Sequence, residues 1–312
     1  MTGDLRVLGF GSIAIDDIIY VDRPLKAGKG KVMGRVTDHG GNVATALVAV
    51  AMLGGRAGFI GWLSDQPLND AAARELEKHG VDISFAPRRP DAKAIRSVII
   101  VGPDGERFIA YDDEVPHGTS DALTDETLAQ AQALMIDGYA THAHAVVARA
   151  RKLGLAVVAD IEWTIGPATD SLIGLSDHLV LPLGFAQSYT GESKISEILR
   201  KLWSDDRSAV VLTDGEQGAY VRQNDDAVLW HIPAYKVRAV DTTGAGDCFH
   251  GAYAFALTEG KAPLACALYA TAAAAISVTG HGGRKALPGH CACLSRMAGE
   301  DAPVPIPIGN LD

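Results

Sequence analysis

The segment from Asp241 to Asp247 reads Asp-Thr-Thr-Gly-Ala-Gly-Asp and combines two glycines with a carboxylate. It lies between the apolar-alternating residues 235–240 and the small-residue run 249–256, a pattern that predicts a strand, a tight turn and a helix. Gly244 and Gly246 allow a close approach of backbone to ligand, so the free amides of the following helix can bind a phosphate. Asp247 would repel such a phosphate, but it suits a base that activates a hydroxyl nucleophile.

On these residues alone, a plain turn with Asp247 capping the helix is the competing interpretation. The longer string Asp-Thr-Thr-Gly-Ala-Gly-Asp-x-Phe-x-Gly-Ala, which begins at Asp241, resembles the C-terminal signature of ribokinase-like carbohydrate kinases, the PfkB family. The resemblance implies that Asp247 is the general base and that Gly244, Ala245 and Gly246 form an anion hole for the transferred phosphoryl group. The sequence contains no Walker loop, and no G-x-G-x-x-G follows the first predicted strand.

Composition predicts one globular enzyme-sized unit. The 312 residues are 47% hydrophobic and 21% charged, and the net charge is 28 − 38 = −10. This acidic balance argues against non-specific binding to nucleic acid or to an anionic membrane. The four cysteines contain no C-x-x-C pair, and the N-terminus lacks the pattern of a signal peptide, so we expect reduced thiols and a cytoplasmic location.

The order of apolar runs predicts an α/β fold. Four runs each follow a helical segment, as in a parallel sheet with helices on both faces: 133–137, 155–160, 178–182 and 209–213. Two further pairs of short strands, the second closed by a turn at 102–105, predict a small antiparallel sheet. We expect a single domain over residues 1–312, with these strands inserted at about 17–37 and 94–112. The resemblance implies a ribokinase-like three-layer domain with a mainly parallel central sheet, in which the small sheet is a lid over the sugar and the surface of a homodimer.

Two N-terminal motifs predict the binding site of the phosphoryl acceptor. Asp16 follows the apolar run 6–15, where a carboxylate can either accept hydrogen bonds from sugar hydroxyls or cap a turn. The match of Gly11-Ser12-Ile13-x-x-Asp16 to the family favours the sugar-binding role. Gly40 and Gly41, followed by Asn42 and Thr45 at the start of a predicted buried helix, resemble the family's N-terminal signature. The polar residues after the glycines differ from those of many members, so the groups that face the sugar must differ from those of ribokinase.

Two glycine-containing loops predict the nucleotide site. The loop with Thr213, Gly215 and Gly218 resembles the family's Thr-x-Gly-x-x-Gly nucleotide loop, although a plain hairpin turn would explain it too. The second loop holds Gly280 and Gly283, and in the family it borders the adenine. Thr243 is a further nucleotide contact, and the family often holds K⁺ near the positions of Asp241 and Thr243. The resemblance implies ATP and Mg²⁺ as cofactors, but the usual Asn-x-x-Glu is absent at 181–187, which leaves the magnesium ligands unassigned.

Four functions remain in competition at this level. An ATP-dependent kinase for a hydroxyl of a small sugar or sugar derivative leads, and a nucleoside kinase of the same fold is the nearest alternative. The nucleoside reading needs aromatic surface against the base, and Tyr20, Phe108 and Tyr111 on the lid do not decide it. A catalytically idle sugar sensor would not need Asp247, and the missing dinucleotide fingerprint argues against an NAD-linked oxidoreductase.

Overall fold

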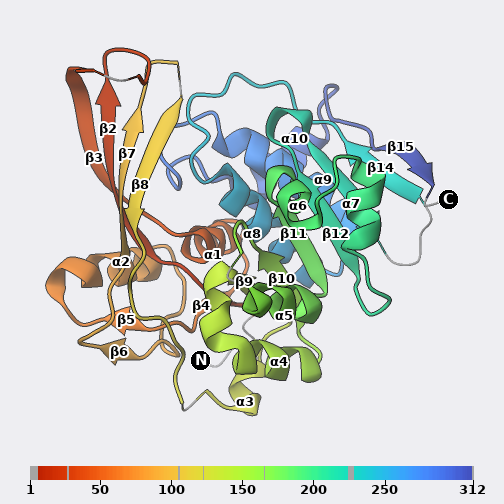
Figure 1. The fold of residues 1–312 in the computed structure, drawn as a ribbon, viewed down its shortest axis with the longest axis horizontal. Helices are drawn as coiled ribbons and strands as arrows, with labels where there is room; N and C mark the ends of the chain where they lie inside the picture. Colours follow the sequence, from red (N-terminus) through yellow and green to blue (C-terminus); the bar gives the residue numbers. More distant parts are fainter. Residues whose placement is uncertain are drawn as a thin grey trace.

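The computed structural model describes residues 6–310 except 27, 105, 122, 165 and 224–227. The strands of its larger sheet are β1 (Val7–Phe10), β4 (Ala57–Phe59), β9 (Ala133–Asp137), β10 (Ala156–Asp160), β11 (His178–Pro182), β12 (Ala209–Thr213), β13 (Ala219–Gln223), β14 (Val228–Ile232) and β15 (Ile306–Asn310). They lie in the order β15-β14-β13-β12-β11-β10-β9-β1-β4 (Figure 1). Pairing is parallel from β4 to β12 and antiparallel from β12 to β15, so the mainly parallel central sheet is confirmed.

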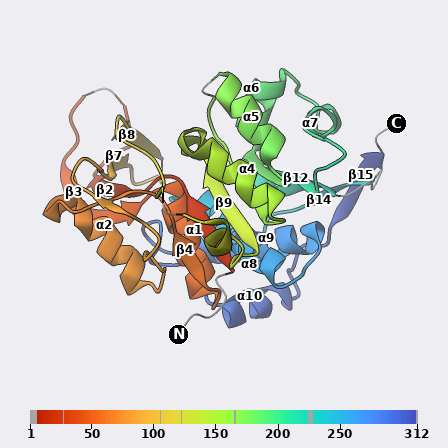
Figure 2. The same cartoon turned by 90° about the horizontal axis from the view of Figure 1, so that it is seen from below.

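Helices cover both faces of this sheet and complete three layers (Figure 2). One face packs against α1 (Asn42–Met52), α8 (Ala245–Thr258), α9 (Pro263–Ser277) and α10 (His290–Met297). The other packs against α4 (His144–Lys152), α5 (Pro167–Leu175), α6 (Leu183–Thr190) and α7 (Ile195–Lys201). The remaining helical elements are α2 (Pro67–Lys78), α3 (Asp125–Leu128) and the short 3₁₀ segments η1 (Gly138–Ala143) and η2 (Gly215–Gln217).

Strand β9 shows why these apolar runs form central strands. Met135 belongs to the core on the α8 side, whereas Leu134 and Ile136 belong to the core on the α4 side. All three side chains are fully buried. A strand that is covered on both faces requires an unbroken apolar run, which is the pattern seen in the sequence.

The smaller sheet stands beside the main body on the left of Figure 1. It consists of β2 (Ala14–Val21), β3 (Val32–Gly40), β7 (Ile95–Val101) and β8 (Arg107–Asp112), in the order β3-β2-β7-β8. Its outer pairings are antiparallel as expected, while β2 and β7 pair in parallel. The predicted turn at 102–105 is closed by a 2.9 Å hydrogen bond from the Gly102 amide to the Glu106 carbonyl, and residue 105 lies outside the described residues. A separate pair, β5 (Leu63–Ser64) and β6 (Arg88–Arg89), is parallel.

Two local expectations were wrong. Asp16 does not end the first strand of the main sheet, because β1 stops at Phe10 and Asp16 lies inside β2 of the small sheet. The chain leaves the main sheet at Gly11 and enters β2. A side chain at position 11 would clash, because its Cβ atom would lie 2.4 Å from the Asp137 carboxylate. That carboxylate accepts a hydrogen bond from the Ser12 amide.

The second error concerns residues 235–240, which form no strand. Tyr235, Val237 and Ala239 all line a cavity next to α8, described below. Extended backbone places alternate side chains on one side, so a cavity wall produced the same alternation as a sheet.

No helix within the described part of the chain is long and apolar enough to cross a bilayer.

Candidate active site

Two cavities meet at the start of α8. The first has a volume of about 370 Å³ and lies between the small sheet and the carboxyl ends of the main strands, as open α/β sheets favour. The second has a volume of about 310 Å³. Thr242, Ala245 and Gly246 line both. The first draws its other walls mainly from residues 12–163, whereas the second is lined by residues from 213 to 278 alone.

The turn before α8 has the backbone of an anion site. Gly244 caps the helix with φ +72°, and a Cβ there would lie 2.8 Å from the Gly283 carbonyl oxygen. Gly246 differs, because a Cβ at this position would meet no protein atom within 4 Å and would enter the space between the cavities. The Ala245 amide donates to the Thr242 carbonyl at 3.3 Å and the Cys248 amide donates to Gly244. The helix therefore leaves the Gly246 and Asp247 amides for a ligand.

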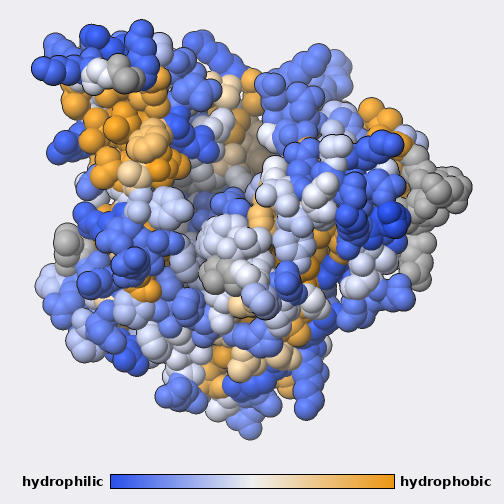
Figure 3. Space-filling model, in the orientation of Figure 1, coloured by the Kyte–Doolittle hydropathy of each residue, from blue (hydrophilic) through white to orange (hydrophobic). Residues whose placement is uncertain are grey.

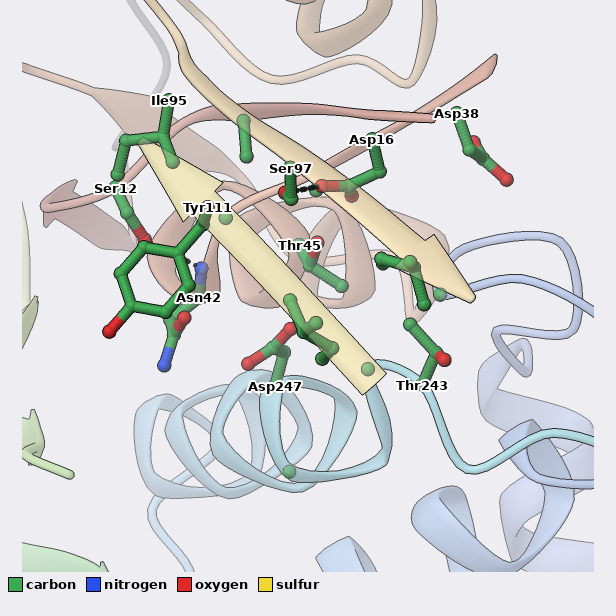
Figure 4. A pocket seen from close by; sticks show the side chains of 18 of the residues that line it. Ser12, Asp16, Asp38, Asn42, Thr45, Ile95, Ser97, Tyr111, Thr243 and Asp247 are labelled. Atoms are coloured by element: carbon green, nitrogen blue, oxygen red, sulfur yellow. Dashed lines mark hydrogen bonds between the residues drawn. The ribbon is translucent and has the colours of Figure 1, made fainter. Parts of the chain in front are cut away.

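Asp247 lies in the first turn of α8 and points into the first cavity (Figure 4). Burial raises the pKa of its carboxyl well above the ordinary value, and the charges of Asp160 and Glu162 raise it further. His250 and Arg284 oppose this shift. A raised pKa makes a carboxylate a better proton acceptor, as a general base requires.

Asp16 faces Asp247 across the cavity from β2 (Figure 4). Its carboxylate accepts a hydrogen bond from the Ser97 hydroxyl on β7. Burial raises its pKa, although this hydrogen bond and the charge of Arg284 lower it. Gly40 must be glycine here, because its Cβ would lie 2.1 Å from the other Asp16 oxygen.

The start of α1 brings the other predicted acceptor residues to the same cavity. Gly41 caps α1 with φ +92°, where a Cβ would lie 2.5 Å from the Ser12 carbonyl oxygen. Asn42 and Thr45 line the cavity from the first turns of the helix (Figure 4). The Ser12 hydroxyl accepts a 2.8 Å hydrogen bond from the Asn42 amide, which fixes the helix start against the end of β1.

Arg284 is a buried cation behind the residues that line the first cavity. The sequence did not identify it as a site residue. Its Nε donates to the Thr45 hydroxyl at 3.1 Å and its Nη2 donates to the Gly40 carbonyl at 2.8 Å. The side chain is 5% exposed, and Nη1 has no hydrogen-bond partner. Burial lowers its pKa to about 10, against the charges of Asp38, Asp247 and Asp16. Arg284 thus remains charged at neutral pH and holds the Gly40 loop.

Asp241 ties the turn to the loop that carries Arg284. Its two carboxylate oxygens accept 2.9 Å hydrogen bonds from the Thr243 and Gly282 amides. Burial raises its pKa, but these hydrogen bonds outweigh burial and hold it below the ordinary value. The carboxylate is therefore engaged with backbone amides, which places the two glycine loops side by side.

The predicted nucleotide residues divide between the cavities. Thr213, Gly215 and Gly218 line the second cavity. Thr243 and Gly283 line the first, beside Gly244. Gly280 lines neither cavity, because it packs against Ala286. A Cβ atom at position 280 would lie 2.5 Å from the Ala286 Cβ. The second cavity is otherwise mostly apolar, with Phe249 and small residues of α9 in its wall.

Comparison with known proteins identifies the family. Residues 4–289 match the profile of the pfkB family carbohydrate kinases. The chain belongs to this family. It is 28% identical to ribokinase of Bacillus subtilis (strain 168) over 296 residues, covering 89% of this chain and 94% of the relative. It is also 28% identical to the ATP-dependent ribose-1-phosphate kinase of Halopiger xanaduensis over 294 residues, covering 90% and 95%. The solved structure of ribokinase from Thermotoga maritima superposes with a TM-score of 0.76 at 25% identity, covering 95% of this chain and 100% of that one.

The ribokinase-like fold and the carbohydrate kinase class are therefore confirmed for this pfkB family member. The family's Asn-x-x-Glu position falls at the end of β11 and the start of α6, and residues 181–187 offer no carboxylate there. Within the described residues, no group of three or more His, Cys, Asp or Glu side chains forms a preformed metal site. Magnesium usually keeps several waters and binds substrate phosphates, so such a site is not required.

Proposed function

We propose that this pfkB kinase transfers the γ-phosphoryl group of ATP to a hydroxyl of a sugar held in the first cavity. The observation that carries the proposal is the position of Asp247, which faces the first cavity from the same helical turn that separates it from the second. The reacting hydroxyl and the phosphoryl group would meet at Gly246. The second cavity holds the nucleoside of ATP, with Thr213, Gly215 and Gly218 along its edge.

The reaction needs positioning and charge neutralisation more than covalent chemistry from the protein. Asp247 accepts the proton of the acceptor hydroxyl while its oxygen attacks the γ-phosphorus. The bond between the γ-phosphorus and the bridging oxygen breaks, and ADP leaves with the bond electrons. The backbone amides of Gly246 and Asp247 bind the equatorial oxygens, as an anion hole does. The Ala245 amide, expected in the anion hole, donates to the Thr242 carbonyl instead.

ATP and magnesium fit the residues present. The apolar wall of the second cavity suits a purine ring, and the α8 N-terminus suits phosphate. Magnesium would enter with ATP, bound by phosphates and water, and would neutralise the charge that develops on the bridging oxygen. A monovalent cation near Asp241 and Thr243 would be bound by carbonyl oxygens, because both Asp241 oxygens already accept hydrogen bonds.

The sugar would be held by Asp16, the Gly40-Gly41 backbone, Asn42 and Thr45. All of them line the first cavity. Arg107 on β8 extends from the small sheet to the Thr242 hydroxyl, so the lid contacts the turn when it covers the acceptor. A lid in this position excludes water, which would otherwise compete as the nucleophile.

The small sheet also presents an apolar outer face that fits a second copy of the chain. Val32, Met33, Val98 and Phe108 are 51%, 65%, 40% and 60% exposed. Apolar side chains accordingly gather over this sheet in Figure 3. Exposed apolar patches of this kind mark interaction surfaces, and a two-fold axis would pair the patch with itself. We propose a homodimer through this face.

The test is ADP formation from MgATP with a panel of sugars, compared between the native protein and Asp247→Asn. The substitution should lower kcat by roughly 10²–10⁴ with little change in the KM for ATP, the usual effect of losing a positioned base. Asp91→Asn makes the same charge change at an exposed site paired with Arg89 and should leave kcat unchanged. A near-native kcat in Asp247→Asn would remove Asp247 from the mechanism.

A further inference from the structure

The first cavity carries more carboxylates than one neutral sugar needs. Among the described residues that line it are five acidic side chains, Asp16, Asp38, Asp113, Glu162 and Asp247, and a single guanidinium, that of Arg107. His39 lines it too, but burial lowers its pKa, so its ring is neutral at pH 7. The phosphate chain of ATP adds further negative charge at the Asp247 end. Arg284 behind the wall offsets part of this charge at Asp38, Asp16 and Asp247. The remaining excess of negative charge lies at Asp113 and Glu162.

The side of the cavity near Asn42 is aromatic as well as acidic. Tyr111, Tyr139 and Trp163 line it together with Asp113 and Glu162. Figure 4 shows Tyr111 on the side of the cavity near Asn42, away from Thr243. Trp163 lies edge-to-face on Tyr139 with ring centroids 5.0 Å apart, and a Cβ at Gly138 would lie 2.7 Å from the Trp163 ring.

Hydrogen bonds hold this wall in place. The Tyr139 hydroxyl donates to Asp113 Oδ2 at 2.9 Å, and the ring of His117 stacks on the other face of Tyr139 with centroids 4.3 Å apart. Tyr139 is consequently 8% exposed, whereas Tyr111 is 64% exposed and Glu162 is exposed to the cavity. Tyr139, Trp163 and Asp113 therefore form a surface that exists before any ligand binds.

Behind the wall lies a carboxylate with an unused acceptor. Asp160 ends β10, two residues before Glu162, and is 1% exposed. Its Oδ2 accepts a 3.1 Å hydrogen bond from the side-chain amide of Asn42, which lines the cavity. Its Oδ1 has no hydrogen-bond partner but lies 3.5 Å from Nε2 of His250. Asp160 thus fixes the Asn42 side chain at this side of the cavity.

A cationic nitrogen meets every feature of this surface. An ammonium group offers three N–H donors to carboxylates and binds well over Tyr and Trp rings. A phosphate or carboxylate on the same ligand would be repelled by Asp113 and Glu162, because Arg107, the one guanidinium among the described lining residues, contacts Thr242 instead.

We propose that this end of the first cavity, formed by Tyr111, Asp113, Tyr139, Glu162 and Trp163, is a subsite for an amino group, so that the preferred acceptor is a sugar carrying a protonated amine. The proposal rests on the proposed function for the identity of the rest of the cavity. An amine subsite would distinguish this chain from relatives that are named for an anionic acceptor, such as the ribose-1-phosphate kinase.

Two matched acceptor series test the proposal through kcat/KM with MgATP. One comprises D-glucosamine, N-acetyl-D-glucosamine, D-glucose and D-gluconate; the other comprises 1-amino-1-deoxy-D-fructose, D-fructose and D-fructose 1-phosphate. In at least one series the amine should exceed its neutral partner by about tenfold or more, the effect of one charge-assisted hydrogen bond. Glu162→Gln and Asp113→Asn should each reduce that ratio severalfold, while Asp91→Asn should leave it unchanged.

Calorimetry without nucleotide measures the subsite separately from catalysis. Tighter binding of D-glucosamine or 1-amino-1-deoxy-D-fructose than of the matched neutral sugar supports the amine subsite. This holds even if no sugar in the panel yields ADP, because the lack of ADP formation would count against the kinase proposal instead. Equal or weaker binding of both amines overturns the amine subsite. A preference for the neutral nucleoside uridine would overturn the amine subsite and would indicate that this wall binds a nucleobase. A Glu162→Gln variant that keeps the amine preference but requires more magnesium would assign that carboxylate to the metal.

Discussion

Replacing Arg284 with methionine should impair catalysis without unfolding the protein. Burial lowers the Arg284 pKa from 12.5 to about 10, so keeping it charged below that pH costs about 3 kcal/mol of folding free energy. Because the folded-state pKa is the lower one, this cost is fully present at neutral pH and falls away only as the pH rises above about 10. Methionine removes the cost but leaves the Gly40 carbonyl and the Thr45 hydroxyl without their donors, a penalty of about 1–3 kcal/mol each. The net change in the unfolding free energy should therefore lie between a gain of about 1 and a loss of about 3 kcal/mol.

The catalytic effect follows from the charges that Arg284 faces. Asp38 on β3, Asp16 on β2, Glu75 on α2 and Asp247 on α8 all interact with its charge. Loss of a nearby cation raises a carboxyl pKa, so the pKa of Asp247 should rise further. Because Asp247 must be ionised to act as the base, the acid limb of the kcat/KM profile should move to higher pH. The rate on that limb should fall, and the rate at high pH should fall much less.

The assay is kcat/KM for the acceptor between about pH 5.5 and 9, with melting temperature as the stability control. Arg284→Lys keeps the charge and should restore most of the acid limb, although it cannot hold Thr45 and Gly40 together. Lys285→Met, which removes the neighbouring and largely exposed cation, should leave the limb in place. An unmoved acid limb in Arg284→Met, with a native melting temperature, would refute the reasoning.

Three further outcomes follow from the site and a fourth from the outer face of the small sheet. Gly246→Val should retain the native melting temperature, because a Cβ at this position meets no protein atom within 4 Å. The variant should nevertheless abolish phosphoryl transfer by filling the space between the cavities, and residual transfer would contradict the anion site. Gly244→Ala should instead lower stability by about 1–2 kcal/mol in denaturant unfolding, since φ is +72° and the Gly283 carbonyl is close. Asp16→Ala should raise the acceptor KM far more than the ATP KM, and equal changes would make Asp16 structural. Phe108→Glu should convert a dimer into a monomer in sedimentation, whereas a monomeric native protein would exclude the proposed dimer.

Much of the architecture was readable from sequence because it follows from local patterns. The apolar runs at β9 to β12 were placed correctly because strands covered on both faces are apolar between their ends. The turn at Gly244 was readable because its residues are consecutive and the left-handed backbone requires glycine.

What the sequence did not reveal depends on distant partners. Arg284 contacts Thr45 and Gly40, which lie 239 and 244 residues away, and an isolated arginine after two glycines gives no local signal of burial. Tyr139 and Trp163 were equally hard to assign, because their place in the cavity wall depends on the neighbouring ends of β9 and β10. Phe108 was considered as aromatic surface against the base of a nucleoside. It lines a hollow on the outer face of the small sheet instead.

The division of the two cavities along the chain bears on how such enzymes can diversify. The second cavity uses only residues 213–278, while the first uses residues 12–163 together with the shared turn and Gly283. A genetic crossover between about residues 164 and 212 would therefore join most of the first cavity of one kinase to the second cavity of another. Only the loop that carries Arg284 would need to be inherited with the N-terminal half, which makes chimeras of this kind a direct route to altered acceptor range.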